Sequence, residues 1–172
     1  TPITADIHDK LDRDDFTVER VAFESHPGLF VTGSLFRPKA DGQKRPIVLC
    51  PHGHWKDARF FSHDAAKIKQ EIELGAEIFE KGGRNPVVAR CVHLARMGCT
   101  VFLYDMLGYS DNTPLSFELI HGHAKQRPEM SQPDHWGLFS AQSELRLLNA
   151  LGLQTWNSIR ALDWMVTLPD VD

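Results

Sequence analysis

Residues 16–23 and 29–36 predict two strands, and along the first of them hydrophobic and polar residues alternate. This period of two is typical of half-buried strands. The tripeptide His26-Pro27-Gly28 between them has the composition of a turn, so the two segments predict an antiparallel hairpin. Residues 1–15, which precede it, are polar and rich in aspartate, and we expect them to form a surface arm.

Two later segments, residues 46–51 and 99–104, are apolar on both faces, as expected of strands buried inside a sheet. Apolar residues at helical spacing predict helices over residues 65–81, ended by Gly82-Gly83, and over residues 86–97. Strand, helix, strand is the unit of a parallel sheet. The sequence therefore predicts an α/β fold, a three-layer sheet in which the hairpin is followed by parallel strands with flanking helices.

The last third of the chain contains a loop-rich segment followed by a helical region. Residues 112–137 are loop-rich, and we expect them to form an insertion. This insertion could be a functional lid or rim of the site, or a loop without a function, and the sequence leaves both alternatives open. Helix resumes over residues 140–168, with a break expected near Gly152. Four apolar residues at helical spacing predict the face that packs on the sheet: Trp156, Ile159, Leu162 and Val166. We expect Trp156 and Trp164 to be core residues.

Composition and charge narrow the range of partners. The net charge is −4, and no run of Lys or Arg is present, so we expect neither nucleic acid nor an anionic membrane as a partner. No stretch approaches the roughly 20 apolar residues that span a bilayer. The cysteines Cys50, Cys91 and Cys99 form no CxxC pair, and their surroundings predict buried thiols rather than a disulfide framework.

The strand at residues 46–51 ends in a sequence suited to catalysis, His52-Gly53-His54-Trp55. The carboxyl edge of a parallel sheet is where open α/β proteins bind ligands. Gly53 lets the backbone turn sharply, because it has no Cβ, and the backbone amide of His54 then points outward. Such an amide stabilises the negative charge that develops on an ester carbonyl, and losing one costs about 3–4 kcal/mol of barrier. We predict that His54 contributes to an oxyanion hole, that Trp55 lines a pocket or covers the sheet end, and that His52 is structural.

A second loop follows the strand at residues 99–104. Asp105 and Ser110 are suited to hold this loop through hydrogen bonds to backbone amides. Neither is expected to be a nucleophile, because residues 108–112 lack the second glycine of a Gly-x-Ser-x-Gly elbow. No such elbow occurs anywhere in the chain.

Three motifs occur in an order that resembles the acetylxylan-esterase-like branch of the α/β-hydrolases, near the dienelactone hydrolases: 52–54, 105–110, and 154–164 followed by 168–172. The resemblance extends from about Phe16 onward. It implies that residues 1–172 are the N-terminal portion of one α/β-hydrolase domain and that His54 contributes only its amide. The nucleophile and the rest of the triad are expected beyond Asp172, in the same or a second polypeptide, on a strand that pairs with residues 47–50.

The resemblance also implies a reaction. The expected reaction is hydrolysis of a carboxylic ester by a serine-type hydrolase, which needs no metal or organic cofactor. The expected substrate is a small ester or an acetylated carbohydrate such as acetylxylan. A prolyl-oligopeptidase-like peptidase is the alternative within the same fold. Secretion or a periplasmic location is implied by the family alone, and the residues themselves leave the compartment open.

Two hypotheses from other classes stay open. The His-x-His pairs His52/His54 and His121/His123 have a spacing that can present two imidazoles to zinc, as in a metal-dependent hydrolase. Position 56 is Lys56, however, where the metallo-β-lactamase-like pattern needs an aspartate, so we expect no metal. A non-catalytic hydrolase-like module is the other alternative, because the chain has no nucleophile elbow.

Overall fold

The computed structural model describes residues 2–55, 57–120, 141–146 and 148–172. Its strands are β1 (Asp6–Asp12), β2 (Phe16–His26), β3 (Leu29–Pro38), β4 (Ile47–Leu49) and β5 (Thr100–Tyr104). Its helices are η1 (Ala58–Phe60), α1 (Ala65–Glu73), α2 (Glu80–Arg84), α3 (Pro86–Arg96), α4 (Phe117–Ile120), α6 (Ala141–Glu144) and α7 (Ala150–Met165). None of the helices in these described ranges is long and apolar enough to cross a membrane.

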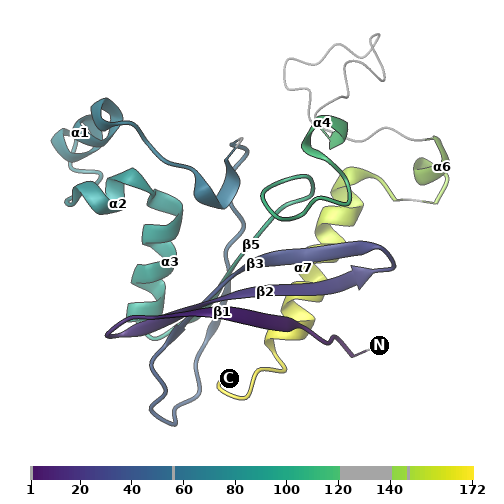
Figure 1. Ribbon diagram of the computed structural model, residues 1–172, viewed down its shortest axis with the longest axis horizontal. Helices are drawn as coiled ribbons and strands as arrows, with labels where there is room; N and C mark the ends of the chain where they lie inside the picture. Colours follow the sequence, from purple (N-terminus) through teal and green to yellow (C-terminus); the bar gives the residue numbers. More distant parts are fainter. Residues whose placement is uncertain (1, 56, 121–140, 147) are drawn as a thin grey trace.

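The strands form one mixed sheet in the order β1-β2-β3-β5-β4 (Figure 1). β2 and β3 pair in antiparallel fashion, which confirms the expected hairpin, and β3 continues antiparallel to β5. β4 and β5 are parallel, with Ile47 opposite Thr100 and Leu49 opposite Phe102. The prediction of a hairpin followed by parallel strands is therefore confirmed.

The N-terminal segment differs from the surface arm expected for residues 1–15. Residues 6–12 form β1, which pairs antiparallel with β2 and places Asp6 opposite Ala22. Every residue of β1 is exposed, so backbone hydrogen bonds hold this strand, and no buried apolar face marks it in the sequence. Charged side chains on such an edge strand hinder its pairing with another molecule.

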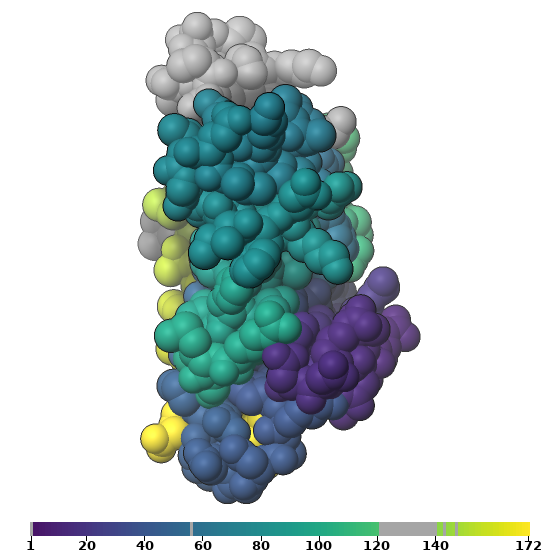
Figure 2. Space-filling model, turned by 90° about the vertical axis from the view of Figure 1, so that its left-hand side faces the viewer, coloured from purple at the N-terminus to yellow at the C-terminus, as the bar shows by residue number. Residues whose placement is uncertain are grey.

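Helices cover both faces of the sheet, as predicted. Side chains of β5 alternate between the faces: Phe102 and Tyr104 lie in one core cluster with residues of α7, whereas Val101 and Leu103 lie in a second cluster with residues of α3. Figure 1 shows α3 and α7 on opposite sides of the strands. In Figure 2, α1 and α2 lie beyond one end of α3 and away from β1.

The helix expected over residues 65–81 is shorter in the structure. α1 ends at Glu73, because Gly75 follows with a φ of +73° that a helix cannot continue. Gly82 and Gly83, expected to stop the helix, lie inside the separate helix α2. α3 agrees with its prediction, since Pro86 occupies its first turn.

The break in the C-terminal helical region is also misplaced in the sequence prediction. α6 ends at Glu144 and α7 begins at Ala150, so Gly152 lies inside α7 rather than at a break. Asn149 starts the helix, because its side chain accepts a hydrogen bond from the Gly152 backbone N–H at 2.7 Å. Most of the loop-rich segment 112–137 lies outside the described residues, and α4 lies within its described start.

The predicted packing face of α7 is wrong. The four residues expected to pack on the sheet are between 42% and 58% exposed: Trp156, Ile159, Leu162 and Val166. The buried residues of the helix are instead Ala150, Leu153, Gln154, Asn157, Ala161, Trp164 and Met165. Small and polar residues contribute to this face, so a count of large apolar residues at helical spacing selected the other side. Trp164 is in the core as expected, whereas Trp156 is not.

Candidate functional site

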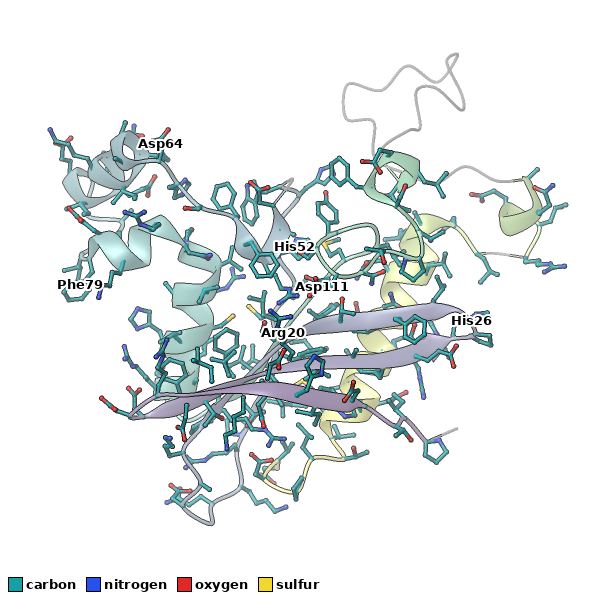
Figure 3. The ribbon with its side chains drawn as sticks, in the orientation of Figure 1. Arg20, His26, His52, Asp64, Phe79 and Asp111 are labelled. Carbon is teal, nitrogen blue, oxygen red and sulfur yellow. The ribbon has the colours of Figure 1, made fainter. Side chains whose placement is uncertain are left out.

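The segment after β4 and the loop after β5 leave the sheet at one edge. Because β4 and β5 are parallel, their carboxyl ends lie side by side. Figure 3 shows His52, from the first segment, near Asp111, from the second, above the ends of the strands. The residues that the sequence singled out at 52–55 and 105–110 are thus brought together by the parallel pairing.

His52 connects these two segments. It is only 4% exposed, and its Nε2 accepts a hydrogen bond from the Met106 backbone N–H at 3.1 Å. Its Nδ1 lies 2.7 Å from the Gly53 carbonyl oxygen, to which it donates in the matching tautomer. Burial lowers the pKa of His52, which favours this neutral form. The ring therefore holds the end of β4 against the loop after β5.

The turn after His52 depends on Gly53 and Trp55. A Cβ at position 53 would lie 2.4 Å from the Trp55 ring, so any other residue there would require the indole to shift. The Trp55 ring stacks on Phe61, with centroids 4.8 Å apart. The Trp55 backbone N–H donates to the Gly53 carbonyl at 2.9 Å, which makes a three-residue turn centred on His54. His54 is exposed at the tip of this turn.

We expect Gly53→Ala to lower the free energy of unfolding by about 1–3 kcal/mol, because the added methyl group collides with the Trp55 ring. Chemical denaturation of the variant would measure this loss. In a Trp55→Ala background the same substitution should cost much less, because the colliding ring is gone. An equal cost in both backgrounds would show that the contact with Trp55 is not the reason for glycine at this position.

A buried ion pair lies beneath the turn, and its cation was not anticipated from the sequence. Asp105 is fully buried and accepts hydrogen bonds from Arg59 Nε at 2.7 Å and from the Thr32 hydroxyl at 2.8 Å. The remaining guanidinium nitrogens of Arg59 donate to the Ser34 hydroxyl at 2.8 Å and to the Asp111 carboxylate. Arg59 therefore ties η1, the hairpin and the loop after β5 into one network.

Burial is the main influence on Asp105 and raises the pKa of its carboxyl, while the charge of Arg59 opposes that rise. Ser110 plays a different part from the one predicted. It adopts a left-handed φ of 48°, and its buried hydroxyl makes no well-formed hydrogen bond within the described ranges, although it lies close enough to Asp105 to lower that pKa. Ser110 thus shapes the loop mainly through its backbone.

Arg160 and Asp163 lie three residues apart on α7, a spacing that allows a local ion pair. The structure shows the local pair, with 2.7 Å between Arg160 Nη1 and Asp163 Oδ2. The partner of Asp105 is Arg59. Its sequence context, a short segment after the His54 turn, carries no periodicity that could have marked it as buried.

The loop after β5 also carries an aromatic contact to the site. Tyr109 is buried, and its ring packs edge-on against His52, with centroids 4.9 Å apart. Burial raises the pKa of Tyr109 to about 12. A groove of about 320 Å³ borders the loop and is lined by Gly108, Ser110, Thr113, Ser116, Phe117 and Glu118.

The described residues give no support to the zinc hypothesis. Across the ranges 2–55, 57–120, 141–146 and 148–172, no three His, Cys, Asp or Glu side chains are grouped in a way that could hold a metal ion. Both ring nitrogens of His52 contact protein groups. The second His-x-His pair, His121/His123, lies outside the described residues.

No protein-family model and no curated protein matches the sequence. Among solved structures, the chain resembles Methylesterase BT1017, with a TM-score of 0.55, 24% sequence identity and 98% of this chain covered. The fold is shared with a methylesterase. This chain spans 28% of the length of that protein.

Proposed function

We propose that this chain carries the oxyanion-hole part of a serine-type carboxylic-ester hydrolase. The observation that supports the proposal is the turn centred on His54, which follows parallel strand β4 at the sheet edge shared with β5. In this proposal the His54 backbone N–H donates to the carbonyl oxygen of the ester as negative charge develops there. Trp55, which is 40% exposed and stacked on Phe61, forms a wall beside it.

The motifs of this chain include no nucleophile elbow, so the proposal places the nucleophile on a further strand. The free side of β4 is where such a strand could pair. On the side of β4 away from β5, Arg45 and Val171 form a parallel bridge. The Arg45 N–H donates to the Asp170 carbonyl and the Asp172 N–H to the Arg45 carbonyl, each at 2.9 Å. We propose that a strand carrying the Gly-x-Ser-x-Gly elbow extends this pairing, in the same or a second polypeptide. Its carboxyl end would then lie beside the His54 turn.

The proposed reaction divides between the two parts. The elbow serine attacks the ester carbonyl, and a histidine paired with a carboxylate transfers the proton. His54 shares the oxyanion through its amide, while His52 and the Arg59–Asp105 pair keep the turn in place. No metal or organic cofactor takes part in this proposal.

The substrates proposed are short esters, with acetylated carbohydrate first because of the resemblance described from the sequence motifs. The name of the structural neighbour adds methyl esters to the compounds worth testing. A prolyl-oligopeptidase-like peptidase remains the alternative within the fold. Acetylated xylan, a methyl-esterified polysaccharide and a proline-containing peptide, assayed in parallel, separate these possibilities.

We expect the full gene product to hydrolyse p-nitrophenyl acetate and to lose this activity completely on treatment with a serine-directed phosphonate. A fluorescent phosphonate should label the protein, and heat-denatured protein should not be labelled. Activity that survives the phosphonate but disappears with a chelator and returns with zinc would replace the proposal with the metallohydrolase. Absence of both hydrolysis and labelling would favour the non-catalytic module.

A further inference from the structure

A second hollowed surface lies at the tip of the β2–β3 hairpin. Two hollows, of about 580 and 310 Å³, share His26 and Trp156 in their walls and therefore meet at these two residues. The larger is completed by residues 2–4, residues 24–27 and Arg160, and the smaller by Leu148, Gly152 and Leu153. Figure 3 shows His26 at the hairpin tip, well apart from His52. Their volumes lie within the range of ligand-binding pockets.

The Trp156 side chain is fixed at this place although much of it is exposed. Its Nε1–H donates to the Ser25 carbonyl oxygen at 2.8 Å, and 42% of the residue remains accessible. Ser25 is buried and tied to α7, because its hydroxyl donates to Asn157 Oδ1 at 2.6 Å. An indole whose N–H already has a partner can offer its apolar ring to a ligand at little further cost in side-chain entropy.

Polar side chains of both charge signs surround this ring. The Arg160 guanidinium carbon lies 5.8 Å from the centroid of the Trp156 ring, and Asp163 balances its charge at 2.7 Å. The hairpin contributes Glu24 and His26, both exposed. An anion is not favoured here, because Glu24 and Asp163 oppose it. A hydrocarbon chain is not favoured either, because the walls carry charged and hydrogen-bonding groups. The surface suits a neutral ligand with an apolar face and many hydroxyl groups.

We propose that this surface binds a neutral carbohydrate chain, with one sugar ring stacked on Trp156 and neighbouring units in the two hollows that meet there. A pyranose ring has a face of C–H groups that can pack on an indole, and its hydroxyl groups both donate and accept hydrogen bonds. Glu24, His26 and Arg160 supply partners of both kinds. The inference stands independently of the proposed ester hydrolysis, because the residues described as lining the hollows do not include those of the His54 turn.

Isothermal titration calorimetry of the full-length protein with soluble hexasaccharides tests the proposal. The probes are β-linked oligomers of xylose, of glucose and of mannose. We expect saturable binding of at least one of them, accompanied by a change in tryptophan fluorescence. Trp156→Ala should weaken this binding at least about tenfold, because the stacking ring is lost. Trp156→Phe should retain most of it, because phenylalanine keeps an aromatic face.

The matched control is Ile159→Ala. Ile159 is 46% exposed on the same helix and lies outside the residues that line the two hollows, so binding should not change. His26→Ala alters an exposed side chain shared by both hollows and should weaken binding several-fold, which decides the question if Trp156→Ala does not fold. His54→Pro should bind as tightly as the unaltered protein, so failure of this site and failure of the proposed ester hydrolysis are distinguishable.

Absence of binding to all three neutral hexasaccharides would overturn the proposal. Equal affinity of Trp156→Ala and the unaltered protein would place the sugar elsewhere on the molecule and would equally contradict it. Tighter binding of a uronic-acid hexasaccharide than of any neutral one would show that charge, rather than stacking on Trp156, selects the ligand, and would replace the neutral carbohydrate with an acidic one.

Discussion

Replacing His54 with proline is expected to lower kcat for ester hydrolysis by about 10²–10³-fold, because the substitution removes the backbone N–H proposed to stabilise the oxyanion. His54→Ala is the matched control. It retains the N–H and removes only the imidazole, so its kcat should stay within a few-fold of the unaltered protein. Steady-state hydrolysis of p-nitrophenyl acetate by both variants gives the comparison.

The geometry of the turn makes proline a suitable probe. His54 is the central residue of the three-residue turn and has a negative φ. Such a turn has a central φ near −75°, which the proline ring can adopt. Gly53, which precedes it, tolerates the restrictions that proline imposes on its neighbour. Circular dichroism and thermal unfolding should therefore show a folded His54→Pro variant.

Equal activities of the proline and alanine variants would contradict a role for the His54 amide. A large loss in both would point to the imidazole instead and would favour a function for the ring. Either result would rule out the His54 backbone N–H as the group that stabilises the oxyanion.

Arg59→Met is expected to lower the free energy of unfolding by about 3–5 kcal/mol, since it leaves the fully buried carboxylate of Asp105 without its cation. Arg20→Met is the matched control, because Arg20 is exposed and its contact with Asp9 is 3.7 Å long on the surface. The control should change stability by no more than about 1 kcal/mol. Urea titrations of the two variants measure both values.

The loss in Arg59→Met should depend on pH in a predictable direction. Burial already raises the pKa of Asp105, and removal of Arg59 raises it further. The folded variant therefore binds a proton that the unfolded chain releases above its pKa of about 4. The free energy of unfolding of Arg59→Met, relative to the unaltered protein, should therefore fall as the pH rises above about 4 and recover as the pH is lowered below about 4.

The double variant Arg59→Met/Asp105→Asn tests whether the two residues act as a pair. Asparagine keeps an oxygen that can accept from Thr32 and carries no charge. The Arg59 substitution should therefore cost much less in the Asp105→Asn background than alone. Strictly additive losses would show that Arg59 stabilises the loops through contacts other than the one to Asp105.

The sequence was a good guide wherever periodicity reflects burial. The first hairpin strand alternates and the two parallel strands are mostly apolar, and both patterns correspond to strands in the structure. It failed for β1, because every residue of that strand is exposed and no buried face marks it in the sequence. It failed again for α7, where Asn157 and Ala161 belong to the buried face and Trp156 does not.

The candidate site shows the same division. The turn at Gly53–His54 and the loop at Asp105 were found from the sequence, because glycine and side-chain-capped turns leave local signals where strands end. The contact of Trp55 with Gly53 and the bond from His52 to Met106 join residues whose proximity depends on how the chain folds. Arg59 was missed for that reason.

The sequence by itself therefore determined the strand order along the chain, the parallel pair and the edge at which the site residues emerge, because these depend on local patterns of polarity and on turn residues. Only the tertiary structure decided which charge neutralises Asp105, which face of α7 is buried and that Cys50 and Cys91 share one core cluster. Each of these is a contact between segments distant in sequence. The energy of such a contact comes from the burial of both partners, and the sequence around one residue does not indicate which distant residue it will contact.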